Sequence, residues 1–279
     1  MEYGLSTYLY INERLNSHIL DQTLGTGIRN LEIFAARQHL DYTDVNHVRD
    51  IASWFRDHDV TLHSVHAPLY ADTDWGRLGG LAVSVAYLEH RLRVDSMDEI
   101  KRALEIADHL PFRYLILHVG FPGEEYDLAK FDAAMTSLEH LKVFAKERSV
   151  QLLLENIPGD LGAPERLLHF LRYTRLGLKT CLDVGHAHMT CGVPAAFETL
   201  RDTIASTHVH DNRGENDDHL MPFDGDIDWT AAVPEFRRGQ GQFPVLFELR
   251  AMGPAPNSLA RLAEVMRRLE ALNSGGIYP

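Results

Sequence analysis

The sequence predicts a single α/β domain with the architecture of a (β/α)8 barrel, and three observations support this prediction. Eight apolar or β-branched runs alternate with amphipathic stretches of helical spacing along all 279 residues. Several of these runs are almost wholly apolar, as expected of parallel strands that are covered on both faces. The length suits one barrel of about 250 residues, and no linker divides residues 1–279. An open doubly wound sheet is the alternative, disfavoured because no Gly-rich phosphate loop follows the first strand.

The expected strands are short and are spread over the whole chain. They are Tyr3–Tyr10, Asn30–Ala35, Val60–His66, Tyr114–Val119, Val150–Glu155, Leu178–Val184, Ala205–His210 and Pro244–Leu249. Eight strands that are each followed by a helix define a (β/α)8 barrel, whose crossovers must be right-handed.

The stretches between the strands carry the marks of helices. Ser96 and Glu99 have the spacing of a capping box, which predicts a helix that begins there. Apolar residues then recur at helical spacing in several stretches. Two such stripes are Leu128, Phe131, Met135, Leu138 and Leu141, and Leu259, Leu262, Met266 and Leu269.

One long irregular insertion, Ala71–Asp95, interrupts the alternation after the third strand. It contains Trp75, Gly76, Gly79 and Gly80. On a barrel, a loop in this position extends over the catalytic face, where it could close over a substrate. A plain surface excursion is the other interpretation.

Composition and charge exclude several classes of protein. The formal net charge is −13, which disfavours a nucleic-acid or anionic-lipid partner because phosphate binding needs clustered Lys and Arg. The N-terminal residues are too polar for a signal peptide, and no apolar stretch reaches the ~18 residues of a membrane span. Two cysteines, Cys181 and Cys191, form no CxxC pair; we expect them only to pack, in a reducing compartment. These features predict a cytoplasmic protein with no membrane partner.

Polar residues end six consecutive strands of the predicted barrel. They are His66 in HSVHAP, His118 in LILHVG, Glu155 in LLLENIPG, Asp183 with His186 in CLDVGHAH, His210 in HVHDN, and Glu248 in LFELR. The loop after His210 adds Asp217 and His219. The carboxyl ends of barrel strands share one face, where active sites are built. So many acids and imidazoles would be costly to bury together without a cation, and this mixture suits Zn or Mn better than Mg or Ca.

These motifs, in this order, resemble the xylose-isomerase-like barrel superfamily. That group includes sugar isomerases and epimerases and the apurinic endonucleases. The segments that carry the resemblance are HAP, LHVG, ENIPG, DVGH, HVHDN, the downstream Asp-x-His, and FEL. They extend over nearly the whole chain, and they identify the superfamily better than the reaction.

The resemblance implies a set of metal ligands. The site common to the superfamily matches Glu155, Asp183, His210 and Glu248, which would hold one divalent ion. The endonuclease-type branch adds two ions, for which His66 and His118 match with a bridging Glu155, and His186 matches with Asp217 and His219. One to three ions of Zn, Mn, Mg or Co are therefore expected. His208 is interpreted as a core or supporting residue rather than a ligand.

Two enzymatic functions follow from the resemblance. The first is isomerisation or epimerisation of a sugar or sugar phosphate through a cis-enediolate, with Glu155 and Glu248 as the acid–base pair and with His186 and Arg213 orienting hydroxyls. The alternative is a multinuclear phosphoesterase or endonuclease-like hydrolase. The full ligand set favours this alternative, whereas the acidic net charge argues against DNA as its substrate. A non-catalytic metal-binding protein is a third class. A homodimer is left open.

Overall fold

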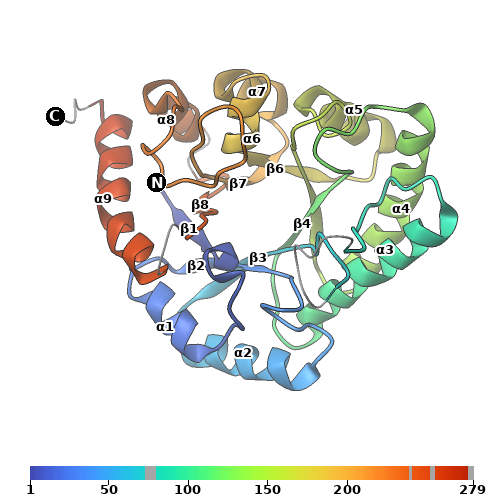
Figure 1. The fold of residues 1–279 in the computed structure, drawn as a ribbon, viewed down its shortest axis with the longest axis horizontal. Coiled ribbons are helices and arrows are strands. Elements are labelled where there is room, and N and C mark those ends of the chain that lie inside the picture. The colour runs from blue at the N-terminus through green and yellow to red at the C-terminus, as the bar shows by residue number, and fades with distance from the viewer. Residues whose placement is uncertain (73–79, 239–240, 252–254, 276–279) are drawn as a thin grey trace.

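Eight parallel strands curl into a nearly closed ring that is surrounded by helices (Figure 1). The computed structural model describes residues 1–72, 80–238, 241–251 and 255–275. The predicted (β/α)8 barrel is confirmed. The strands are β1 (Tyr3–Ser6), β2 (Asn30–Phe34), β3 (Thr61–His66), β4 (Tyr114–His118), β5 (Gln151–Glu155), β6 (Lys179–Asp183), β7 (Ile204–His208) and β8 (Val245–Phe247).

The strands follow one another round the ring in the order β7-β6-β5-β4-β3-β2-β1-β8. Closure between β7 and β8 depends on a single parallel bridge, between Val209 and Phe247, just beyond the last residue of β7. There the Val209 amide donates to the Leu246 carbonyl at 2.8 Å, and the Glu248 amide donates to the Val209 carbonyl at 3.2 Å.

Helices lie on the outside of the ring and bury their apolar faces against it (Figure 1). In the described chain they are α1 (Ser17–Leu24), α2 (Val45–Asp57), α3 (His90–Leu104), α4 (Leu128–Lys146), α5 (Pro164–Thr174), α6 (Val184–Met189), α7 (Val193–Leu200), α8 (Trp229–Arg238) and α9 (Ala255–Asn273), with 3-10 turns η1 (Thr7–Tyr10) and η2 (Glu105–Asp108). The stripe on α4 shows the pattern, since Phe131, Leu138 and Leu141 are buried whereas Leu128 at its start is exposed.

The predicted start of the third helix at Ser96 is wrong. Helix α3 begins at His90, so the irregular insertion ends at Glu89. Ser96 is buried within the helix, where its Oγ accepts from the Ser84 amide at 3.1 Å. Glu99 reaches Arg37 through two hydrogen bonds instead of capping the helix.

Tyr70, just before the insertion, forms an antiparallel bridge with Ala82 inside it. Trp75, Gly76 and Gly79, which the closing-loop prediction singled out, lie outside the described residues. The lid therefore stays a prediction.

Two strand ends also differ from expectation. The first strand stops at Ser6, whose side chain accepts from the Tyr8 amide, and a 3-10 turn continues to Tyr10. The seventh strand stops at His208 instead of His210. In both places an apolar or mixed run continues beyond the point where the chain leaves the ladder, so the sequence pattern alone does not mark the end.

Side chains that alternate along the strands point either into the barrel or onto the helices. On the inward side, Ile116, Leu153 and Cys181 pack together, and each stands two residues before a site residue. Cys181 packs as predicted, but Cys191 is exposed, so the prediction fails for that cysteine. None of the described helices combines the length and apolarity needed to cross a bilayer.

Candidate metal centre

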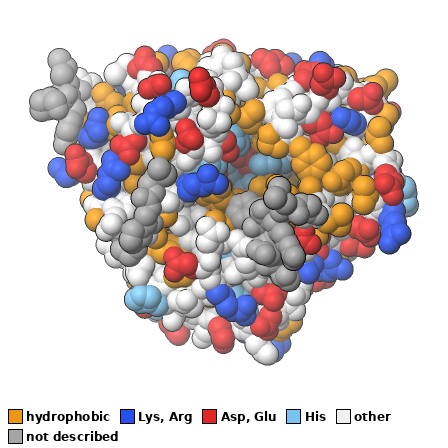
Figure 2. Space-filling model, in the orientation of Figure 1, with side chains coloured by type: hydrophobic (Ala, Val, Ile, Leu, Met, Phe, Trp, Pro, Cys, Tyr) orange, Lys and Arg blue, Asp and Glu red, His pale blue; other side chains and the backbone are white. Residues whose placement is uncertain are grey.

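A cavity opens at the carboxyl ends of the strands, at the centre of the face seen in Figure 2. Histidine and acidic side chains lie at its floor and hydrophobic side chains along one side. The lining residues are Tyr8, Phe34, His66, Leu69, Tyr70, Val83, His118, Gly120, Phe121, Pro122, Glu155, His186, Asp217, His219 and Glu248. The predicted convergence of strand-end residues is thus present in the structure.

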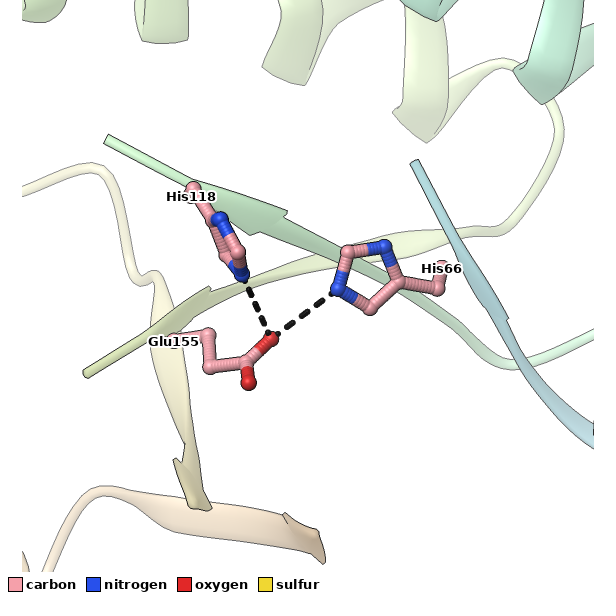
Figure 3. A group of neighbouring side chains, drawn as sticks. All are labelled: His66, His118 and Glu155. Atoms are coloured by element: carbon pink, nitrogen blue, oxygen red, sulfur yellow. Dashed lines mark hydrogen bonds and ion pairs between the residues drawn. The ribbon is translucent and has the colours of Figure 1, made fainter. Parts of the chain in front are cut away.

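The first group of potential ligands comprises His66, His118 and Glu155, at the ends of β3, β4 and β5 (Figure 3). One oxygen of Glu155, Oε2, lies 3.1 Å from His66 Nε2 and 3.3 Å from His118 Nε2. All three residues line the cavity.

The second group comprises Glu155, Asp183, His208 and Glu248, whose ligand atoms all lie within 4.8 Å of one another. His208 Nδ1 is 3.0 Å from Glu155 Oε1, 3.7 Å from Glu248 Oε2 and 3.9 Å from Asp183 Oδ2. The resemblance implied His210 in this position. The structure places His208 in this group, so His208 is a candidate ligand and not only a core or supporting residue. The assignment of His210 as a ligand stays a prediction.

The third group surrounds the Asp217 carboxylate. Its Oδ2 lies 3.2 Å from His186 Nε2 and 3.0 Å from His219 Nε2. His186 comes from α6, immediately after β6, while Asp217 and His219 come from the loop after β7. The three residues that the endonuclease-type pattern implied for a third ion therefore do meet.

His210 lies between the second and third groups. Its Nε2 is 3.1 Å from Asp183 Oδ2 and 3.6 Å from Asp217 Oδ1, and its ring stacks on His219. Its Nδ1 is buried and has no hydrogen-bond partner within the described part of the chain. Metal binding at Nε2 would leave the proton on Nδ1 as an unsatisfied donor, at a cost of about 1–3 kcal/mol. His210 is nevertheless a candidate ligand in two further groups, one with Asp183 and His186 and one with His219 and Glu248.

Close packing fixes the ring of His210. A Cβ added at Gly185 would lie 1.9 Å from His210 Cε1, a distance at which atoms overlap. The glycine in DVGH is therefore required for the approach of this histidine.

In three other histidines, unlike His210, the Nδ1 atom has a partner, because it donates to a backbone carbonyl. The pairs are His66 Nδ1 to Ala67 at 2.8 Å, His186 Nδ1 to Asn156 at 2.8 Å, and His219 Nδ1 to Glu248 at 3.0 Å. Because a carbonyl oxygen only accepts, the proton of the neutral ring lies on Nδ1, and the lone pair of Nε2 faces the carboxylates. This is the orientation of histidines that bind metals, so the residues present fit a divalent ion.

In the metal-free site, buried carboxylates lie close together and repel one another, and a bound cation would offset this repulsion. Burial raises the pKa of Glu248 well above its ordinary value, and Glu155, Glu32 and Asp183 add to the effect. Burial alone would also raise the pKa of Glu155, but His208 and His118 outweigh it and hold that pKa well below its usual range. Glu248 Oε1 is buried and has no hydrogen-bond partner among the described residues. Buried carboxylates of this kind are stabilised by paired cations.

The match to a family model extends over residues 20–269, and the family is described as xylose isomerase-like TIM barrel. The chain belongs to this family. The resemblance inferred from the strand-end motifs is confirmed.

Three curated relatives of this family member share 26–31% identity with it over parts of the chain. They are an uncharacterized protein y4fM of Sinorhizobium fredii (30% over 167 residues, 56% of this chain and 53% of that protein), an uncharacterized protein MJ1614 of Methanocaldococcus jannaschii (31% over 191 residues, 66% and 74%) and a probable endonuclease 4 of Mycoplasmopsis pulmonis (26% over 137 residues, 43% and 47%). The chain thus spans about half the length of the first and third of these proteins.

Solved structures share the same fold. A D-tagatose 3-epimerase-like protein superposes with a TM-score of 0.77 at 21% identity and 99% coverage of both chains. The IOLI protein, solved with a zinc atom, superposes with a TM-score of 0.76 at 16% identity and complete coverage of both chains. At such identity these likenesses show the fold of this family member and no more.

Arg213, predicted to orient substrate hydroxyls, is not brought to the cavity. It is exposed, and its Nη2 donates to the Asp224 carbonyl at 3.4 Å. Tyr8, Phe34 and Phe121 line the cavity although sequence reasoning did not select them. Aromatic residues in apolar runs look like core residues, and only their positions on η1, at the end of β2 and in the loop after β4 distinguish them.

Proposed function

We propose that this chain is a divalent-metal-dependent isomerase or epimerase that acts on a small sugar. The observation that carries the proposal is that two carboxylates, Glu155 on β5 and Glu248 after β8, belong to one ligand group and both open to the same cavity. The ion would be held by Glu155, Asp183, His208 and Glu248. When bound, it would polarise a substrate carbonyl and stabilise negative charge on its oxygen.

The two glutamates would move the proton. One removes it from the carbon beside the carbonyl, and the other delivers a proton to give the isomer or epimer through an enediolate. Positioned groups of this kind contribute about 10²–10⁴-fold each. His186, which also lines the cavity, would hold a substrate hydroxyl.

The cavity wall supports a small sugar as the substrate. Tyr8, Phe34, Leu69, Val83 and Phe121 present apolar surface, and no lysine or arginine is found among the described residues that line it. Aromatic faces pack well against the C–H face of a sugar. Arg250, which interacts with the hydroxyl of Tyr8, places a cationic group beside this wall.

Hydrolysis of a phosphoester is the second candidate, and the complete three-group ligand set favours it. Two or three ions can stabilise both the attacking and the leaving oxygen of an in-line displacement. The net charge of −13 argues against a nucleic-acid substrate, because duplex binding needs a basic surface.

Hydrogen exchange distinguishes the two candidates. Metal-loaded protein is incubated with a panel of ketoses and aldoses in heavy water, and incorporation of deuterium at carbon is followed by NMR. We expect exchange and isomer formation by the wild type and a loss of at least 100-fold in Glu248→Gln. Glu215→Gln, an exposed acid in the loop after β7, is the matched control and should retain full activity. Cleavage of phosphoesters without exchange on any sugar would reject the isomerase.

A further inference from the structure

Glu32 is a buried acid at the centre of the barrel that no step of the proposed reaction uses. It lies on β2 with none of its surface exposed and is not part of the cavity wall. Its Oε2 accepts a hydrogen bond from Ser64 Oγ at 2.7 Å and lies 3.2 Å from His208 Nε2. Since it cannot reach a substrate in the cavity, any role in the reaction must act through His208.

The ring of His208 links Glu32 to the second ligand group. A neutral imidazole carries one proton, and the nitrogen without it offers a lone pair. With the proton on Nε2, donated to Glu32, the lone pair of Nδ1 faces Glu155, Asp183 and Glu248 at the distances given above. The reverse assignment would direct an N–H at the ion position.

The acceptor on His208 differs from those on the neighbouring histidines. His66, His186 and His219 donate to backbone carbonyls, whereas His208 faces a full carboxylate. An anionic acceptor increases the basicity of the ring nitrogen on the other side, and loss of such outer partners costs typically 10- to 100-fold in metal affinity. His210, two residues along, has no acceptor for Nδ1 in the described chain.

We propose that Glu32 is a positioning residue that holds the His208 proton on Nε2 and so makes His208 Nδ1, not His210, the imidazole ligand of the central ion. The inference rests on the metal centre of the proposed function. It assigns no contact between Glu32 and the substrate.

The test measures Co²⁺ binding to the full chain, without substrate, by chelator competition and visible absorption. Glu32→Gln keeps the size of the side chain and removes its charge. We expect the affinity of the central ion to fall 10- to 100-fold and the Co²⁺ spectrum to shift. Glu99→Gln is the matched control, because Glu99 is also a buried glutamate but pairs with Arg37 and Arg102, outside the site. It should lower the Tm of both metal-free and Co²⁺-loaded protein and leave the affinity and the spectrum unchanged.

A double-mutant cycle shows whether Glu32 acts through His208. In a His208→Asn background, Glu32→Gln should cause no further loss of affinity, whereas additive losses would overturn the proposal. If Glu32→Gln does not fold, Glu32→Asp makes the same test, since the shorter side chain withdraws the carboxylate from His208 Nε2 and should lower the affinity for Co²⁺. Unchanged Co²⁺ affinity in that variant would also overturn it.

The outcomes separate this inference from the proposed function. Wild-type affinity and spectrum in a folded Glu32→Gln protein reject the role of Glu32 alone. Co²⁺-loaded wild type that binds as expected but exchanges no carbon-bound hydrogen rejects the isomerase alone. Wild type that binds no Co²⁺ rejects both.

Discussion

At the scale of single residues, hydrogen-bond partners distinguish one histidine from another. His66, His186 and His219 each donate a hydrogen bond from one ring nitrogen to a backbone carbonyl. One ring nitrogen of His208 contacts a carboxylate instead. Within the described chain, Nδ1 of His210 has no hydrogen-bond partner. Since ring orientation and tautomer are set by these partners, residues of the same type and similar burial acquire different chemistry.

His39 gives a pH prediction away from the site. It is fully buried, its Nδ1 donates to the Glu13 carbonyl at 2.7 Å, and its Nε2 has no partner among the described residues. Burial lowers the pKa of His39 to about 4. Between pH 6.5 and 4 the unfolded chain therefore binds a proton here that the folded chain does not, so the free energy of unfolding falls as the pH is lowered through this window.

Urea unfolding of metal-free protein at pH 7.5 and pH 5 measures the effect. His39→Gln should reduce the acid-induced loss of stability by about 2 kcal/mol, from the part of the shift that lies above pH 5. His18→Gln, on the exposed side of α1, controls for removal of a histidine. Equal losses in the wild type and His39→Gln would contradict the prediction.

At the scale of elements, the loop after β7 is organised around the buried carboxylate of Asp211. Its Oδ1 accepts from the Asn212 and Ile227 amides, and its Oδ2 accepts from the Phe223 amide and the Trp229 indole. Within this loop, His219 and Phe223 have φ values of 49° and 77°. Such left-handed conformations persist where the surroundings fix them, and here they orient a candidate ligand.

Asp211→Asn should loosen this loop. The amide group would face two donors, so hydrogen bonds to a charged acceptor worth about 1.5–3 kcal/mol each are lost. We expect lower stability, a changed Trp229 fluorescence and a lower metal content, measured by elemental analysis, because Asp217 and His219 line the candidate metal centre. Asp228→Asn changes an exposed acid that accepts from the Thr230 and Ala231 amides and should keep the full metal content. Full metal content in Asp211→Asn would show that the loop does not depend on this residue.

At the scale of the whole molecule, buried acidic side chains are concentrated inside the barrel, near the carboxyl ends of its strands. Glu32, Glu155, Asp183 and Glu248 are each less than 5% exposed, and such a concentration of acids destabilises a fold unless cations offset it. Burial alone would lower the pKa of His186, but Asp183 and Asp217 outweigh it and raise that pKa well above its ordinary value. Protons and a bound metal ion would therefore compete for the same groups.

Removal of metal should lower the thermal stability of the whole chain. At a metal concentration 1,000 times Kd, binding adds about 4 kcal/mol, which corresponds to a rise in Tm of about 10 °C for a chain of this size. Calorimetry with EDTA and with Zn²⁺ at pH 7.5 measures the difference. The increment should shrink at pH 5.5, because imidazoles that must be neutral to bind metal are protonated there. A Tm that is the same with and without metal would contradict the prediction.

The strand-end groups were predictable from sequence because parallel strands bring their carboxyl ends to one face. Glu155, Asp183, Glu248 and the flanking histidines each close an apolar run, so the barrel prediction alone places them together. Glu32 also breaks an apolar run, in NLEIF, and a lone acid in a buried strand was a usable sign of a polar partner inside the barrel.

The remaining features depend on contacts between distant segments. His208 ends β7 and His210 lies two residues beyond it. In the proposed centre their roles differ through Glu32, which is 176 residues away from His208 in the sequence. The start of α3 was missed because the Ser96 side chain, which has the spacing of a helix cap, instead accepts a hydrogen bond from the Ser84 amide inside the fold. Arg213 was misplaced because its loop directs it to Asp224.

The bridge between Val209 and Phe247 stands directly beside two members of the central ligand group, since His208 precedes the one and Glu248 follows the other. An ion bound by both side chains would link β7 to β8, the pair of neighbouring strands that is joined by a single bridge. Binding of the ion and closure of the barrel between β7 and β8 would then be one equilibrium, and loss of the ion would first separate His208 from Glu248.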